Sequence, residues 1–186
     1  MSASQVQKGR WKETAGAVNI GCCGFTVSRQ KYFGEFAVVE VQQTFYNLPR
    51  LDTAERWRKE APKGFEFTVK AWQLITHEPT SPTYRRLRVK LEKGGRGRYG
   101  GFKPTEDVAE AWRKFLEFAR KLGAKKVIFQ CPASLRPTPE NRANIRKFFL
   151  SVERSGITCI WEPRGEWKPE EIREICEECS LVHCVD

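Results

Sequence analysis

The sequence of 186 residues has no long apolar stretch and no apolar segment near its N-terminus. No uninterrupted apolar run approaches the roughly 20 residues that a membrane-spanning helix needs, so we expect neither a membrane span nor a membrane partner. Residues 1–17 are polar and basic and lack the apolar core of a secretory signal. We therefore expect a flexible basic tail there and a cytoplasmic protein.

Motifs that identify several large enzyme classes are also missing. The glycine-rich segment 94–101 is not followed by Lys-Ser or Lys-Thr, as a phosphate-binding P-loop requires. The same segment does not open directly after a predicted strand, so it is not the fingerprint of a dinucleotide-binding domain either. The pattern of a classical nucleophilic triad is absent, and the function has to be inferred from individual side chains.

The composition predicts a folded chain. Hydrophobic residues make up 40% and aromatic residues 12% of the sequence, enough to offset chain entropy by burial. The length suits one domain, which we place at residues 18–186. It falls short of the roughly 250 residues of a closed eight-stranded α/β barrel.

The positive charge is concentrated in one segment. The formal net charge is +10, and residues 85–103 contain eight basic residues against the single acidic Glu92, with five glycines among them. This segment is predicted to be an insertion in the domain, either a solvated loop or a surface that contacts the phosphates of nucleic acid. In the second case the binding residues are Arg85, Arg86, Arg88, Arg96 and Arg98.

Six apolar runs rich in β-branched residues predict six strands. They are Val18–Cys23, Ala37–Gln43, Phe65–Ala71, Lys126–Cys131, Ile157–Trp161 and Leu181–Val185. Helical patterns lie between them: one at 52–60 capped by Asp52, one that ends at Gly123, and two that begin at Thr138 and Pro169. Strands that alternate with helices predict a mainly parallel α/β sheet with right-handed crossovers.

In sheets of this kind the ligand site lies at the carboxyl ends of the strands. The side chains expected there are Cys22, Cys23, Gln42, Thr44, Tyr46, Lys70, Trp72, His77, Gln130, Cys131, Glu162, Arg164, Trp167 and Asp186.

Short motifs at these positions resemble those of a known family. They are Ile20–Phe25, Val39–Tyr46, Phe67–Ala71 followed by Ile75–His77, Phe129–Pro132, Trp161–Arg164 with Trp167, and Val185-Asp186. Their order and spacing over about residues 18–186 are similar to the YecE-like family, also known as domain of unknown function 72. The resemblance implies a TIM-barrel-like fold and no particular reaction.

The family pattern continues into further strands and helices beyond the point where this sequence stops. We therefore expect an incomplete or open barrel of about six strands, which lacks roughly two β/α units. Its first and sixth strands would each lack a neighbour on one side. Because unpaired strand edges promote pairing with another chain, we expect self-association through these edges.

Two charged pairs near the predicted strand ends are candidate catalytic groups. Glu40 lies inside an apolar run, and Lys70 on the next strand is its natural partner. The two form either a general acid–base pair with tuned pKa values or a structural ion pair. Glu162 and Arg164 point the same way, so Arg164 either holds an anionic ligand or forms a salt bridge with Glu162.

Two rings near the same ends also have two interpretations each. His77 is either a catalytic base or anion-binding group, or merely an exposed loop residue. Trp167 either stacks on a ligand ring or packs in the core.

The seven cysteines indicate reduced thiols, because the number is odd and the chain has no secretory signal. Cys176, Cys179, His183 and Cys184 superficially resemble a zinc site. However, the first two lie on the inward stripe of a helix, and the last two point to opposite faces of a strand, so we expect no metal there. A metal, a cluster or a redox pair stays open for the cysteines near the strand ends, which are Cys22, Cys23 and Cys131.

Together these features favour an enzyme that acts on a small anionic or phosphorylated substrate, with hydrolysis and isomerisation both open and the cofactor unknown. The predicted catalytic residues are Glu40, Lys70, His77 and Glu162, and the predicted substrate-binding residues are Gln42, Tyr46, Gln130, Arg164, Trp167 and Asp186. The alternative is a nucleic-acid-binding module that uses the basic segment.

Overall fold

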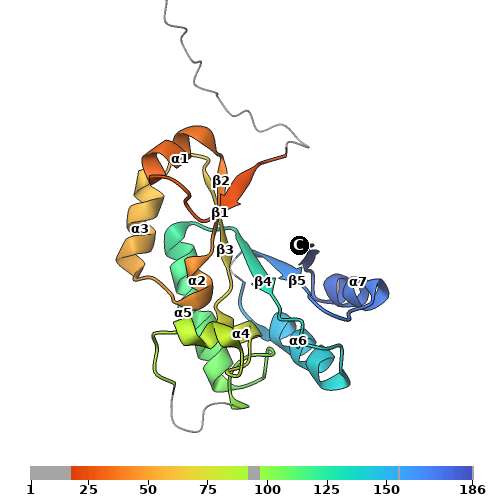
Figure 1. The fold of residues 1–186 in the computed structure, drawn as a ribbon. Coiled ribbons are helices and arrows are strands. Elements are labelled where there is room, and N and C mark those ends of the chain that lie inside the picture. Colours follow the sequence, from red (N-terminus) through yellow and green to blue (C-terminus); the bar gives the residue numbers. More distant parts are fainter. Residues whose placement is uncertain (1–17, 92–96, 155, 186) are drawn as a thin grey trace, which may run out of the picture.

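The computed structural model describes residues 18–91, 97–154 and 156–185. They form a curved sheet of six parallel strands in the order β1-β2-β3-β4-β5-β6, so that each strand pairs with its neighbours in sequence (Figure 1). The strands are β1 (Gly21–Cys23), β2 (Val38–Val41), β3 (Glu66–Lys70), β4 (Lys126–Gln130), β5 (Thr158–Glu162) and β6 (Val182–His183). The expected tail at 1–17, Arg96 and Asp186 lie outside the described residues.

Helices connect successive strands. They are α1 (Arg29–Glu35), α2 (Gln43–Tyr46), α3 (Leu51–Glu60), α4 (Gln73–Thr76), the 3₁₀ helix η1 (Pro82–Arg86), α5 (Glu106–Leu122), α6 (Pro139–Ser151) and α7 (Pro169–Glu178). This alternation around an unclosed parallel sheet confirms the expected open, TIM-barrel-like α/β fold. Within the described ranges, no helix combines the length and the apolar character that a membrane span requires.

The helix ends follow the capping chemistry of the sequence, with one exception. Thr105 and Thr138 each accept a hydrogen bond from a backbone N–H three residues further on, as N-caps do. The expected capping role of Asp52 is wrong, because α3 already begins at Leu51. Asp52 lies in the first turn instead, where the attraction between its negative charge and the positive end of the helix dipole stabilises the helix.

Side chains alternate between the two faces of the sheet with the period of two that strands impose. One face packs against helices through buried apolar side chains, which are Val39, Val41, Phe67, Val69, Val127, Phe129, Cys159 and Trp161. The opposite face, here called the open face, carries Val38, Glu40, Glu66, Thr68, Lys70, Lys126, Ile128, Gln130, Thr158, Ile160 and Glu162. A hollow of about 400 Å³ lies over the open face.

Aromatic packing fixes β4, in the middle of the sheet, against its helices. The ring of Phe129 lies 5.6 Å from Trp112 of α5 and 4.8 Å from Phe149 of α6, measured between ring centroids. All three side chains are buried. This packing holds the carboxyl ends of the central strands in place.

The edge strand β1 is tied to β2 by a side chain as well as by the sheet. The Tyr32 hydroxyl accepts a hydrogen bond from the Cys22 N–H at 2.7 Å and donates one to the Val38 carbonyl at 3.0 Å. Among the described residues, β1 pairs only with β2, and β6 pairs only with β5. The sheet therefore has two unpaired edges in the part of the chain that the structure describes.

Candidate active site

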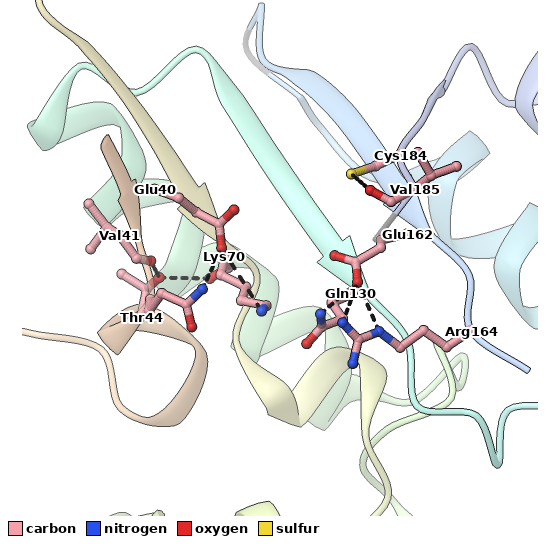
Figure 2. Close-up of polar contacts among 10 residues, drawn as sticks. Glu40, Val41, Thr44, Lys70, Gln130, Glu162, Arg164, Cys184 and Val185 are labelled. Atoms are coloured by element: carbon pink, nitrogen blue, oxygen red, sulfur yellow. Dashed lines mark hydrogen bonds and ion pairs between the residues drawn. The ribbon is translucent and has the colours of Figure 1, made fainter. Parts of the chain in front are cut away.

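Four polar side chains from four neighbouring strands gather at the carboxyl ends of the sheet (Figure 2). Glu40, Lys70, Gln130 and Glu162 each lie at or near the end of a strand, at positions that the alternation assigns to the open face. Figure 2 shows them as two groups, with Glu40 and Lys70 in one and Glu162 with Gln130 and Arg164 in the other. Three of them, Lys70, Gln130 and Glu162, were expected at strand ends from the sequence, and Glu40 and Lys70 are neighbours as expected.

Glu40 lies against Lys70 and is largely enclosed. Its Oε1 is 3.9 Å from the Lys70 Nζ, and the side chains are 21% and 9% exposed. The Gln42 amide donates a hydrogen bond to the same Oε1 at 2.9 Å. Burial raises the pKa of Glu40; the charge of Lys70 and the Gln42 hydrogen bond oppose this effect, and the charge of Glu162 adds to it. Glu40 therefore gives and takes a proton closer to neutral pH than an ordinary glutamate.

Lys70 lies beside two residues of α2, the helix that follows β2. Its Nζ lies 5.7 Å from the ring centroid of Phe45, a cation–π contact. The Thr44 Oγ1 lies 2.8 Å from the Val41 carbonyl oxygen and 2.7 Å from that of Lys70, and so joins the ends of β2 and β3. Thr44 thus holds the backbone at Lys70, whose ammonium group lies on the open face beside Glu40.

Glu162 is fixed by two donors. Its Oε1 accepts hydrogen bonds from the Gln130 amide at 2.6 Å and from the Arg164 Nε at 2.9 Å. Arg164 thus forms the salt bridge with Glu162 that was one of its two interpretations, and its side chain remains 38% exposed. An exposed, oriented guanidinium at a strand end is suited to hold an anionic group.

His77 is buried at the start of the segment after α4. Its Nδ1 lies 2.8 Å from the Thr76 Oγ1, and its ring meets Phe45 edge-on at 4.8 Å. Burial, with smaller effects from the positive charges of Lys70 and Arg164, lowers the pKa of His77 to about 4. The imidazole is therefore neutral at pH 7 and acts there as a hydrogen-bonding group, not as a cation.

Trp167 packs in the core, which was one of its two interpretations. Its ring is buried and meets Trp161 edge-on with 5.0 Å between the ring centroids, and its indole N–H donates to the Leu135 carbonyl at 2.8 Å. Since its polar atom is already satisfied, the side chain packs beneath the strand ends.

Tyr46 and Gln42 face a second cavity at the same ends, beside β1 and β2. This cleft of about 900 Å³ also contains Arg85, Arg86 and Arg88 on its walls. Arg98 lies apart from them, with its Nε 2.5 Å from the Asp107 carboxylate at the start of α5. The five arginines named for nucleic-acid contact therefore do not form one described surface, because three share a cleft, one is paired elsewhere and Arg96 lies outside the described residues.

The cysteines lie in different surroundings. Cys131 is buried, and the indole N–H of Trp161 donates to its Sγ at 3.2 Å. Burial raises the pKa of the Cys131 thiol to about 12, so it stays protonated. Cys23 is exposed, and Cys176 is buried on α7 as the helical pattern predicted. In the ranges that the structure describes, no group of three or more His, Cys, Asp or Glu side chains is placed to hold a metal ion.

One contributor to this end of the molecule was missed by sequence reasoning. Asn47 donates from its Nδ2 to the Arg86 carbonyl at 2.8 Å, and its Oδ1 accepts from the Arg88 N–H at 2.7 Å. It thereby holds the basic segment against the end of β2. The only sequence signal was its place directly after the Tyr46 motif, because its partners lie about 40 residues away.

Comparison with known proteins agrees with this fold. The model of the protein family of unknown function DUF72 matches residues 27–185. The UPF0759 protein YunF of Bacillus subtilis is 40% identical over 47 residues, which cover 25% of this chain and 17% of YunF.

Two solved structures share the architecture. A DUF72 family protein from Enterococcus faecalis V583 superposes with a TM-score of 0.60 and 17% identity, covering 89% of this chain and 61% of that one. A xylose isomerase domain containing protein from Salmonella typhimurium LT2 gives a TM-score of 0.53 and 17% identity, covering 91% and 61%. The chain thus spans less than two thirds of the length of these relatives.

Proposed function

The chain belongs to the DUF72 family of proteins of unknown function, and we propose that it is an enzyme that transfers a proton on a small anionic substrate at the open face. The observation that carries the proposal is Glu40. It is a mostly buried carboxyl group with a raised pKa, it lies 3.9 Å from the largely buried ammonium group of Lys70, and a second carboxylate, Glu162, adds to the rise. Perturbed groups of this kind in a cavity are typical of catalytic sites.

The arrangement suits abstraction of a proton from a carbon next to a carbonyl group. Glu40 takes the proton, and the electron pair moves to the carbonyl oxygen, where the charge of Lys70 stabilises it. On a substrate whose reacting carbon carries a hydroxyl group, return of the proton from Glu40 to the former carbonyl carbon, together with transfer of the hydroxyl proton to the former carbonyl oxygen, completes an isomerisation with no other reactant. Glu162 accepts hydrogen bonds from substrate hydroxyls, and Arg164 binds an anionic group near the reacting carbon.

This choice of isomerisation over hydrolysis rests on the site. The structural relative with a xylose isomerase domain supports the barrel-like frame, and its low identity carries no information about chemistry. The pair of Glu40 and Lys70 supplies the two groups that such a proton transfer needs, a base and a positive charge beside the carbonyl oxygen.

The test is proton exchange with solvent. The full chain is incubated in D₂O with a panel of small hydroxy- and keto-carboxylates and sugar phosphates, and deuterium uptake at carbon is followed by NMR. We expect uptake with at least one compound, and a loss of at least 100-fold in Glu40→Gln.

Glu66→Gln is the matched control. Glu66 lies on the same face and pairs with Lys126 on the next strand at 2.7 Å, but at the amino ends of the strands. It should retain full exchange. The proposal fails if no compound exchanges with the native chain, or if both variants exchange equally.

A further inference from the structure

The cleft beside β1 and β2 differs from the open face in its charge. Its walls come from the β1–α1 connection, the segment from Val41 to Pro49, and the end of η1 with the residues that follow. Of the described residues that line it, three are arginines and none is acidic. We call it the arginine cleft, defined by Cys23, Tyr46, Arg85, Arg86 and Arg88.

The three guanidinium groups have no carboxylate partner among the described residues. Elsewhere in the molecule arginines are commonly paired, as Arg29 is with Glu60 and Arg146 with both Glu174 and Glu178. Within the part of the chain that the structure describes, the arginine cleft therefore concentrates positive charge without a carboxylate partner, in a molecule whose net charge is +10. A concave site lined by one sign of charge attracts ligands of the opposite sign.

The basic segment is held in position for binding. Asn47 makes its two hydrogen bonds to the backbone on either side of Leu87, and the Arg86 guanidinium lies 3.6 Å from the ring centroid of Tyr46. Because these contacts already order the segment, a ligand loses less affinity to the ordering of side chains.

The rest of the wall combines amide side chains with apolar and aromatic ones. Phe25, Leu48, Trp57 and Leu87 line the arginine cleft together with Tyr46. Its volume of about 900 Å³ lies within the roughly 300–1,000 Å³ of small-molecule sites, and an inorganic ion would leave most of it unfilled. The combination of guanidinium groups that lack a carboxylate partner among the described residues with aromatic rings fits a ligand that carries both a phosphate group and a planar ring.

We propose that the arginine cleft binds the phosphate of a ring-bearing organic phosphate, of the mononucleotide class, as one part of the substrate site. This extends the proposed function and rests on it where the reaction is concerned. Gln42 connects the two sites, because it lines the arginine cleft and donates to Glu40 at 2.9 Å. The phosphate would anchor one end of the substrate, while the reacting carbon lies past Gln42 at the open face.

The binding test uses isothermal titration calorimetry with the full chain and three probes: adenosine 5′-monophosphate, adenosine and inorganic phosphate. We expect the monophosphate to bind at least 10-fold more tightly than either of the other two. The double variant Arg86→Gln/Arg88→Gln should lose at least 10-fold in affinity for it. Arg173→Gln removes one exposed positive charge from α7, far from the cleft, and should change the affinity less than two-fold.

A chemical footprint locates the bound probe. Cys23 is exposed at the cleft, so saturating monophosphate should slow its alkylation by iodoacetamide. Cys184, which directly follows β6 at the other edge of the sheet, should react at an unchanged rate. Peptide mass spectrometry reads both sites in one sample. The loss of affinity in the arginine variant counts only if its thermal unfolding midpoint stays within about 2 °C of the native chain.

Three outcomes would overturn the inference: no binding of the monophosphate, equal loss in Arg173→Gln, or no protection of Cys23. Binding of a single-stranded oligonucleotide at least 10-fold more tightly than the monophosphate would also overturn it, in favour of a nucleic-acid surface. The failure of the cleft proposal can be distinguished from the failure of the proposed isomerase function. Proton exchange without monophosphate binding removes only the cleft proposal, whereas monophosphate binding without proton exchange removes only the isomerase.

Discussion

Replacement of Glu40 by glutamine separates a catalytic group from a structural ion pair. The change keeps the shape of the side chain and removes its charge, which leaves Lys70 without its carboxylate partner. Two opposite charges 3.9 Å apart attract by about 4 kcal/mol at an effective dielectric constant of about 20. The burial of a carboxylate costs several kcal/mol.

The direction of the pKa shift shows which effect is larger. Burial outweighs the attraction of Lys70 and raises the pKa of Glu40, so ionised Glu40 is a net cost to the folded state. We therefore expect Glu40→Gln to change the free energy of unfolding by no more than about 1 kcal/mol at pH 7. Loss of one partner from a stabilising buried pair would instead cost about 3–5 kcal/mol.

The pH dependence has a definite sign. A carboxyl group with a raised pKa stabilises the folded state in its protonated form, and this contribution is lost as the pH rises from 4.5 through the raised value. Across that range the native chain should lose stability relative to Glu40→Gln. Urea unfolding of the native chain, Glu40→Gln and Glu66→Gln at several pH values measures the difference. A loss of 3 kcal/mol or more in Glu40→Gln at pH 7 would refute the reasoning and identify a structural ion pair.

Three further predictions concern the frame of the site. Tyr32→Phe removes the hydroxyl that joins the Cys22 N–H to the Val38 carbonyl and should lower the free energy of unfolding by about 1–3 kcal/mol in urea; an unchanged midpoint would contradict it. The NMR titration of His77 should have its midpoint near pH 4, and the folded state should lose stability as the pH falls from 6.5 towards that value, because the buried ring resists protonation; a midpoint near 6.5 would show that the ring is solvated. The unpaired edges of β1 and β6 should cause self-association that sedimentation velocity detects as a concentration-dependent rise in mass, and a monodisperse monomer at high concentration would exclude it.

The sequence was most informative about the order of the elements. Each predicted apolar run contains or overlaps one strand, and the strand is usually shorter than the run. The runs were recognisable because one face of each strand is buried against helices and is therefore apolar. The family resemblance supplied the barrel-like frame, which periodicity alone could not distinguish from other parallel sheets. The strand-end rule placed Lys70, Gln130 and Glu162 at one end, since parallel strands direct all their carboxyl ends to the same side, and Glu40 was recognised as a charge within an apolar run.

The contacts between distant segments were beyond the sequence. Nothing local distinguishes Arg98, which pairs with Asp107, from Arg86, which lies on Tyr46. The charge run appeared uniform, but the path of the backbone after η1 divides it into members that face the cleft and members that do not. The neutral state of His77 likewise depends on burial, which a loop position in the sequence did not predict.

The position of Gln42 makes proton uptake and ligand binding thermodynamically linked. Its amide N–H stabilises the ionised form of Glu40, and the same side chain lines the arginine cleft. A ligand that captures this N–H removes a group that lowers the pKa of Glu40 and so makes the carboxyl a stronger base. By reciprocity, protonation of Glu40 releases the amide and strengthens binding by the same factor. A ligand bound in the cleft would therefore raise the proton affinity of Glu40.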